Sequence, residues 1–306
     1  MPIPSIRPED VRAPTGGIVR ATRRPTGWIA PGPRPPLADA MPGGALTVDD
    51  ALWPTAEEDL CWLAGDFRIL QRLDGHRWSL DDLMTAWVAS RAVAAPSAIC
   101  DMGCGIGTVL LFLAWRFPQA RLVGVEAQPQ SAALARRSIA WNDVGARVEV
   151  HGGDLRDPAV LPDGARFELV TGTPPYFPPG TGIESSRPQC APCRFEHRGG
   201  VEDYVQAAAR LLAPGARAVI CQGSTQTHRV APAAQLAGLA IEATLDVIPR
   251  AGKDVLLSIY TLAHAADARP STHMSLVVRE RDGRWTDDFR VVRNELGMPP
   301  GRDDTP

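Results

Sequence analysis

The 306-residue sequence has no apolar stretch close to the ~20 residues that a membrane-spanning helix needs. Its first 40 residues also lack the apolar segment of a signal peptide. The formal net charge of -3 gives no overall basic excess, which argues against nucleic-acid binding over a large surface. We therefore expect a protein without membrane contacts, in which any nucleic-acid contact depends on a local patch.

The six cysteines form no recognisable disulfide framework. Cys100 and Cys104 flank a glycine loop, and we interpret all six as free thiols in a reducing, cytoplasmic compartment. Cys190 and Cys193, with His197 nearby, match one half of the ligand pattern of a zinc site, but no second cysteine pair lies nearby. We expect this segment to be an ordinary loop that lies over the pocket for the substrate, and we predict no metal site.

Residues 1–45 contain much proline, arginine and glycine and show no sustained apolar period. Such a segment buries too little apolar surface to offset its ordering entropy, so we expect a disordered tail. A phosphate-contacting arm and an organelle-targeting peptide are the alternatives, although the prolines disfavour the amphipathic helix that targeting needs. We expect one domain at 46–300, with a cap at 46–95, a core at 96–265 and a C-terminal extension at 266–300.

Apolar runs and helical patterns alternate along the predicted domain. We expect short helical pieces at 47–53 and 56–67, and a helix that begins at Ser79, where Asp82 completes a shortened capping box. The alternation predicts an α/β fold with a Rossmann-like sheet, mostly parallel with an antiparallel edge strand, and helices on both faces. The predicted strands are 98–102, 121–126, 147–151, 167–173, 216–222, 241–248 and 254–262, and the main helices are 107–117, 131–141, 201–212 and 228–239.

The stretch Ala98–Ala114, AICDMGCGIGTVLLFLA, is typical of a strand, a glycine loop and a helix. Gly103, Gly105 and Gly107 follow Asp101 at alternate positions. Glycines let a ligand approach the main chain, and a helix N-terminus presents free N–H groups. The pattern predicts a loop that holds a nucleotide-like ligand, although it is one residue shorter than the dinucleotide fingerprint G-x-G-x-x-G. An ordinary tight turn is the alternative.

Two further acidic residues follow strands, at the sheet edge where open parallel sheets bind ligands. Glu126 ends the strand after the glycine loop, where a carboxylate can accept hydrogen bonds from two ribose hydroxyls. Asp154 and Leu155 follow the next strand, where they can hold an adenine amino group and ring. Taken in order with Asp101, this pattern resembles that of S-adenosylmethionine (SAM)-dependent methyltransferases. The resemblance implies SAM as the cofactor.

The fourth strand of the core ends in Thr173, Pro174, Pro175 and Tyr176. The two prolines hold the chain extended and leave carbonyls without neighbouring N–H groups. This corner resembles the [DNS]-P-P-[YFW] motif of methyltransferases that modify exocyclic or amide nitrogens. In that motif the first side chain and the first proline carbonyl accept from the target amine, and the aromatic ring stacks on the base. A rigid surface turn is the alternative.

The residues ahead of the glycine loop extend the resemblance. Gln71, Gly75, Ser79, Asp81 and Leu83 lie in Q-x3-G-x-R-x-S-x-D-x-L. With the later R-F-E segment, this layout looks like that of the bacterial family that methylates N6 of adenine 37 in valine tRNA. The resemblance adds Asp81 to the expected cofactor residues, and it implies RNA, most simply tRNA, as the substrate. We expect a monomer.

The acceptor motif departs from that family at its first position, where the usual asparagine is Thr173. Threonine offers one shorter hydroxyl in place of an amide that both donates and accepts. Two alternative functions therefore stay open. One is methylation of a protein side-chain amide or a small metabolite, and the other is a catalytically silent module that binds SAM or RNA.

Overall fold

The computed structural model describes residues 54–55, 57–65, 67–182 and 189–298, together with residue 52 and two short strands near the N-terminus. These two strands, β1 (Val11–Arg12) and β2 (Arg20–Ala21), pair with each other in antiparallel register. The rest of the predicted disordered tail and most of the helical piece predicted at 47–53 lie outside the described residues. No helix among the described residues is long and apolar enough to cross a membrane.

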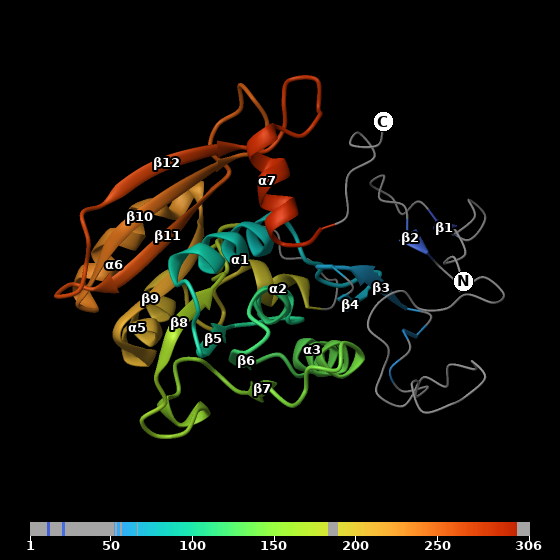
Figure 1. The fold of residues 1–306 in the computed structure, drawn as a ribbon, viewed down its shortest axis with the longest axis horizontal. Coiled ribbons are helices and arrows are strands. Elements are labelled where there is room, and N and C mark those ends of the chain that lie inside the picture. Colours follow the sequence, from blue (N-terminus) through green and yellow to red (C-terminus); the bar gives the residue numbers. More distant parts are fainter. Residues whose placement is uncertain are drawn as a thin grey trace.

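One eight-stranded sheet organises the domain, in the order β12-β10-β11-β9-β8-β5-β6-β7. β11 runs antiparallel to both of its neighbours, and all other neighbouring strands pair in parallel. The predicted mostly parallel sheet is thus confirmed, with β12 as the edge strand beyond the β10–β11 pair (Figure 1). The strands are β5 (Ala98–Met102), β6 (Arg121–Glu126), β7 (Val148–Gly152), β8 (Phe167–Gly172), β9 (Leu212–Gly223), β10 (Leu239–Ile248), β11 (Leu257–His264) and β12 (Thr272–Val277).

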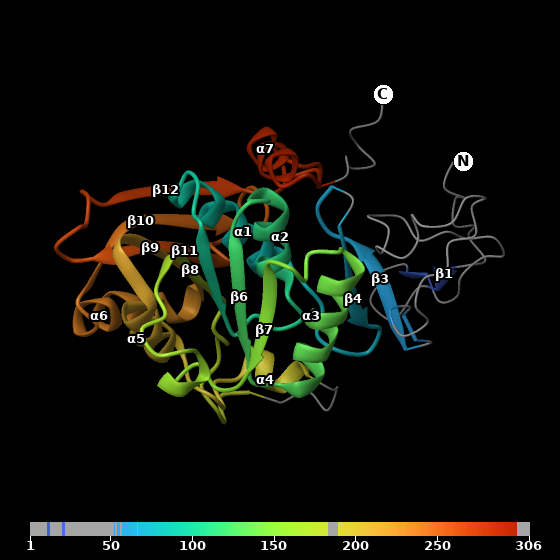
Figure 2. The ribbon, with the colours of Figure 1, turned by 60° about the horizontal axis from the view of Figure 1, so that its bottom comes forward.

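Helices cover both faces of the sheet, as the alternating sequence pattern predicts (Figure 2). Side chains on alternate positions of β5 enter opposite cores: Ile99 packs under one set of helices, and Cys100 and Met102 pack under the other. A strand buried on both faces explains the continuous apolar run in the sequence. The first set comprises α1 (Leu80–Ala92), α2 (Thr108–Arg116), α3 (Pro129–Trp141) and α7 (Asp287–Glu295), and the second comprises α5 (Val201–Leu211) and α6 (Val230–Leu236).

The first helix of the domain begins where its capping residues predict. Ser79 is the N-cap of α1, and its N–H donates to the Asp82 carboxylate at 3.0 Å. This bond satisfies one N–H group at the start of the helix and fixes the direction in which α1 leaves the preceding turn. α1 then packs against α2 and the central strands β8, β9 and β11. Its N-terminal carboxylates therefore lie beside the carboxyl-terminal ends of the sheet strands.

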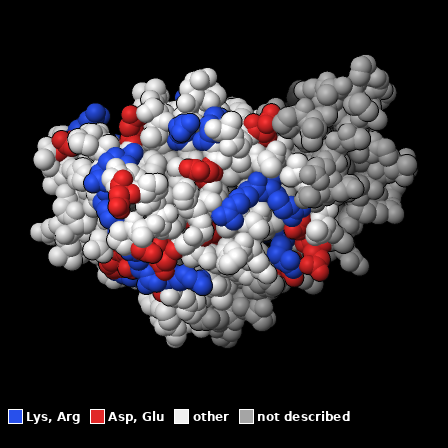
Figure 3. All heavy atoms as spheres, turned by 90° about the horizontal axis from the view of Figure 1, so that it is seen from below, with Lys and Arg blue, Asp and Glu red and all other residues white. Residues whose placement is uncertain are grey.

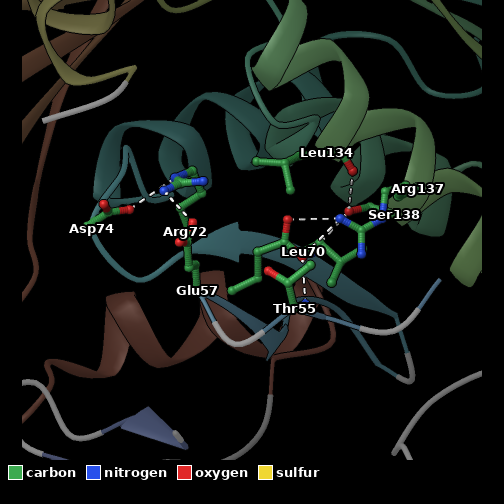
Figure 4. Close-up of polar contacts among 9 residues, drawn as sticks. Thr55, Glu57, Leu70, Arg72, Asp74, Leu134, Arg137 and Ser138 are labelled. Atoms are coloured by element: carbon green, nitrogen blue, oxygen red, sulfur yellow. Dashed lines mark hydrogen bonds and ion pairs between the residues drawn. The ribbon is translucent and has the colours of Figure 1, made fainter. Parts of the chain in front are cut away.

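The helical piece predicted at 56–67 is wrong, because this stretch contains β3 (Glu58–Trp62), which pairs with β4 (Arg68–Arg72). Contacts with α3 stabilise the hairpin: Ser138 Oγ accepts from the Leu70 N–H at 2.9 Å, and Arg137 contacts both carboxylate oxygens of Glu58 at 2.9 Å (Figure 4). Local helix propensity is a weak preference, and these long-range contacts override it.

Candidate functional site

A single pocket gathers the predicted residues at the carboxyl-terminal ends of β5, β6, β7 and β8. It encloses about 950 Å³, part of it open to solvent. Its lining includes every predicted site residue except Gly107: Asp81, Asp101, Gly103, Gly105, Glu126, Asp154, Leu155, Thr173, Pro174, Pro175 and Tyr176.

The glycine loop exposes its backbone to this pocket. Gly103 and Gly105 have φ angles of 61° and 57°, in the left-handed region that other residues rarely adopt. A Cβ at Gly103 would collide with the Tyr204 hydroxyl, whereas a Cβ at Gly105 would meet nothing within 4 Å. Gly107 is instead the N-cap of α2, and a Cβ there would lie 3.2 Å from Ala135 Cβ. Gly105 therefore leaves room for a ligand, while Gly107 allows α2 to pack closely on α3.

Asp101 carries an unsatisfied oxygen at the base of the pocket. Its side chain is buried, and Oδ1 accepts from Thr171 Oγ1 at 2.7 Å. Oδ2 has no hydrogen-bond partner among the described residues. Burial raises the pKa of this carboxyl to about 7, against the bond from Thr171. A cationic donor in the pocket would satisfy the free oxygen and favour the ionised form.

Glu126 joins the glycine loop to the end of β6. Its Oε2 accepts from the Gly105 N–H at 2.8 Å, and its Oε1 accepts from the Gln128 N–H at 2.6 Å. Burial raises the pKa of this carboxyl, and the two backbone N–H groups partly oppose the shift. Each carboxylate oxygen has a second lone pair, so both remain able to accept from a ligand hydroxyl.

Asp154 is held by its own neighbour. The Arg156 guanidinium donates from Nε to Oδ1 at 2.9 Å and from Nη2 to Oδ2 at 2.6 Å. These bonds hold the pKa of the Asp154 carboxyl below its usual range. The bidentate contact fixes the carboxylate at the pocket wall and uses part of its acceptor capacity. Leu155 is buried beside it and presents an apolar surface to the pocket.

The Thr173–Tyr176 corner forms the other half of the pocket. Pro174 is buried, while Thr173 and Tyr176 are partly exposed. The Tyr176 hydroxyl donates to Asp81 Oδ2 at 2.8 Å. Asp81 Oδ1 also accepts from the Ser79 hydroxyl and, at 3.0 Å, from the Asp82 N–H. Asp81, expected on the cofactor side, thus bonds directly to the acceptor corner.

A strap, residues 189–200, crosses the pocket from this corner to α3. It includes α4 (Cys190–Arg194), and it pairs with Phe177 through the Phe177 N–H to Arg194 carbonyl bond at 3.0 Å. At the α3 side, Gln189 Nε2 donates to Ser131 Oγ at 2.9 Å. No cluster of metal-ligating side chains occurs among the described residues, and neither Cys190 nor Cys193 is part of a disulfide bond.

Sequence reasoning missed several residues that line the same pocket. The missed set includes His76, Gln128, Arg198 and Tyr204. Tyr204 looks like an ordinary apolar-face residue of α5, and no local pattern indicates that its hydroxyl lies under the glycine loop. Arg198 lies at the end of a predicted loop, and only the fold of the strap brings it to the pocket. Gln128 lies two residues after Glu126, close to a strand end, so it is the one residue of this set that the strand-end argument could have predicted.

Residues 99–178 match a family model described as a methyltransferase domain. A tRNA1(Val) (adenine(37)-N6)-methyltransferase from Porphyromonas gingivalis is 33% identical over 138 residues, which is 44% of this chain and 53% of that protein. The protein of the same name from Pedobacter heparinus is 26% identical over 230 residues, 75% of this chain and 94% of that protein. A release factor glutamine methyltransferase from Geobacter sulfurreducens is 34% identical over 152 residues, 46% of this chain and 51% of that protein.

Among solved structures, a predicted O-methyltransferase from Agrobacterium tumefaciens superposes with a TM-score of 0.55 and 21% identity, covering 73% of this chain and all of that chain. This likeness confirms the Rossmann-like fold. The chain spans about half the length of the Porphyromonas gingivalis relative. The segment that matches the family model, residues 99–178, contains the glycine loop and the Thr173–Tyr176 corner. The matches support a methyltransferase core at residues 99–178, and they confirm the resemblance to the tRNA adenine-methylating family.

Proposed function

We propose that the chain transfers a methyl group from SAM to an exocyclic adenine nitrogen, N6, in RNA. The observation that carries this proposal is one pocket whose lining includes the predicted cofactor residues other than Gly107, together with Thr173–Tyr176. The names of the relatives support tRNA as the RNA, and we propose it as the substrate. A cytoplasmic location and a monomeric state stay predictions.

The residues of the cofactor half fit SAM by their chemistry. SAM carries a cationic sulfonium, an ammonium group, two ribose hydroxyls and an adenine. The pocket offers a buried unsatisfied oxygen at Asp101, acceptor lone pairs on Glu126, and open space above the Gly105 backbone. Asp154 and Leu155 would bracket the adenine. When bound, SAM supplies an electrophilic methyl group.

At the acceptor corner, the chain's own groups orient the nucleophile. The Thr173 hydroxyl and the Pro174 carbonyl would accept hydrogen bonds from the –NH₂ group, and the Tyr176 ring would stack on the base. Holding the amine and the methyl donor in line removes much of the entropic barrier, so prior deprotonation of the amine is unnecessary. The base must be unpaired or flipped out of its stack to enter.

The test is methyl transfer from labelled SAM to total RNA, followed by identification of the labelled nucleoside. We expect N6-methyladenosine in the tRNA fraction, and we expect Glu126→Ala to abolish it together with SAM binding. SAM binding by calorimetry that is absent in the wild type, or unchanged by Glu126→Ala, would refute the cofactor assignment.

A second candidate acceptor is a protein side-chain amide. The likeness to a release factor glutamine methyltransferase and the replacement of asparagine by Thr173 favour it. Label incorporated into protein, with tRNA left unmodified, would support this candidate. Tight SAM binding without transfer to RNA, protein or metabolite fractions would instead support a silent binding module.

A further inference from the structure

The pocket is rich in acidic side chains, which creates a problem for an RNA substrate. Aspartate and glutamate side chains on the lining outnumber basic ones. Burial raises the pKa of Asp82 and Asp101, so these two are not fully charged near neutral pH, and the carboxylates that are charged suit a cationic cofactor. The same field repels the phosphates that flank any nucleotide in RNA. A substrate of this class therefore needs cations at the pocket mouth. The acidic lining residues are Asp81, Asp82, Asp101, Glu126 and Asp154.

The strap supplies two such cations, Arg194 and Arg198. Both side chains are exposed, and neither forms an ion pair with any residue that the structure describes. Arg198 lines the pocket beside the cofactor half. The Arg194 guanidinium lies 5.9 Å from the centre of the Phe177 ring, directly after the acceptor corner. One free arginine therefore stands near each half of the pocket.

Other arginines in the neighbourhood are already neutralised. Arg156 forms a bidentate contact with Asp154. Arg229 contacts Glu196 of the strap at 2.6 Å and Glu202 of α5 at 2.6 Å. These pairs leave Arg194 and Arg198 as the arginines of the strap that form no ion pair with a described residue, and the charge of Arg198 acts on the nearby carboxylates of Glu126 and Asp154.

Several contacts order the strap backbone between Arg194 and Glu196 before any substrate binds. Beside the bond between Phe177 and the Arg194 carbonyl, the Glu196 N–H donates to the Phe177 carbonyl at 2.9 Å. Glu196 is also bonded to Arg229, and Phe195 is buried against Phe177, with ring centres 5.8 Å apart. Backbone that is already ordered lowers the entropic cost of binding through these side chains.

We propose that Arg194 and Arg198 bind backbone phosphates next to the nucleotide that enters the pocket. This inference rests on the proposed function, and it names the residues that make an acidic pocket accept RNA. The planar guanidinium is suited to bidentate contact with phosphate. The rival acceptor, a side-chain amide of a protein, carries no phosphate and would not need this pair of arginines. Figure 3 shows small basic groups lying next to acidic groups on the face seen from below.

The experiment measures binding of full-length protein to fluorescent tRNA by anisotropy across a range of salt concentrations. Variants are Arg194→Ala, Arg198→Ala and the double substitution. The matched control is Arg121→Ala. Arg121 is an exposed arginine at the start of β6, so it lies at the amino-terminal ends of the parallel strands, away from the pocket. Each lost phosphate contact should reduce the slope of log affinity against log salt by about 0.7–0.9. The control should keep the wild-type slope, and thermal unfolding should show that all variants fold.

Two further measurements separate this inference from the proposed function. SAM affinity, measured by calorimetry, should be unchanged in Arg194→Ala and in Arg198→Ala. A loss of SAM affinity in Arg198→Ala would overturn the phosphate role of Arg198 and assign it to the cofactor half. A wild-type salt slope in the double variant would overturn the phosphate assignment, even if methyl transfer to RNA occurs. If the wild type binds tRNA but transfers no methyl group to it, the proposed function fails and the slopes still test the arginines. Absence of tRNA binding together with methylation of a protein would overturn both.

Discussion

The Tyr176 hydroxyl donates a hydrogen bond of 2.8 Å to Asp81, a residue on α1 that lies 95 positions earlier in the chain. The same hydroxyl lies 3.1 Å from the Cys221 thiol of β9. Burial raises the pKa of Tyr176 well above its usual range, so the phenol stays protonated as a donor. This contact fixes the rotation of the aromatic ring at the acceptor corner and links that corner to the first helix.

The Asp81–Tyr176 bond leads to a first prediction. Tyr176→Phe and Asp81→Asn should each lower methyl transfer while leaving SAM affinity within about twofold. Removing the Tyr176 hydroxyl leaves the Asp81 carboxylate without that donor, which should lower the free energy of unfolding by about 1–3 kcal/mol. The two substitutions should be non-additive by at least about 0.5 kcal/mol in a double-mutant cycle measured by denaturant unfolding. Tyr260→Phe, outside the pocket, is the control, and additive effects would contradict a shared bond.

A second prediction concerns pH. Because the pKa of Asp101 is about 7 in the unliganded protein, its carboxyl is mostly protonated below neutrality. An ammonium donor needs the ionised form, so SAM affinity should rise with pH, by at most about tenfold per unit, and level off above pH ~7. Calorimetry between pH 5.5 and 8.5 tests this. Asp101→Asn should bind more weakly and lose this part of the pH dependence.

The stability of the unliganded protein should change in the opposite direction. The raised native pKa means that native Asp101 retains a proton which the unfolded chain releases above pH ~4. The free energy of unfolding attributable to this residue should therefore fall as pH rises from about 4 to 7. The difference between wild type and Asp101→Asn in denaturant unfolding isolates that contribution. A difference that does not vary with pH would contradict the raised pKa.

The parts of the fold that local pattern determines were predictable. The strand Arg121–Glu126 and the strand Ala98–Met102 have the predicted bounds, because apolar runs with charged or glycine ends define them. Strand ends then indicate the site, since parallel strands bring their carboxyl ends to one edge. For this reason Asp101, Glu126 and Asp154 meet in one pocket although the chain separates them.

The unpredicted parts depend on contacts between distant segments. The β3 strand forms because of pairing with β4 and contacts with α3, none of which leaves a local signal. Tyr204 and Arg198 reach the pocket through the packing of α5 and the path of the strap. Asp81, expected to bind the cofactor, lines the pocket, but the sequence motif gives no indication that it bonds to Tyr176.

A third prediction compares two glycines in similar backbone conformations. Gly105 and Gly164 both have positive φ angles, 57° and 75°, and a Cβ at either would meet nothing within 4 Å. Substitution by alanine should cost each about 1–2 kcal/mol of stability through backbone strain. Only Gly105→Ala should also weaken SAM binding, because its methyl group would occupy pocket space. Equal SAM affinity in the two variants, measured by calorimetry, would remove Gly105 from the cofactor site.

The last prediction concerns Thr173, the position at which the acceptor motif differs from that of the family it resembles. Thr173 lines the pocket directly after β8, and its hydroxyl is the only side-chain hydrogen-bonding group of Thr173–Pro175. Thr173→Ala should lower kcat for RNA about three- to tenfold, the value of one neutral hydrogen bond, while SAM affinity stays unchanged. Thr173→Ser should stay near the wild type because the hydroxyl is retained.

Thr173→Asn supplies the amide that the resembling family uses, with an acceptor oxygen that reaches further than the threonine hydroxyl. If the acceptor is an adenine amine, this variant should match or exceed the wild-type kcat on tRNA. Steady-state rates with labelled SAM measure all three variants on one RNA. A loss of activity in Thr173→Asn together with wild-type activity in Thr173→Ala would mean that the side chain sets the size of the corner rather than the hydrogen bonding of the amine.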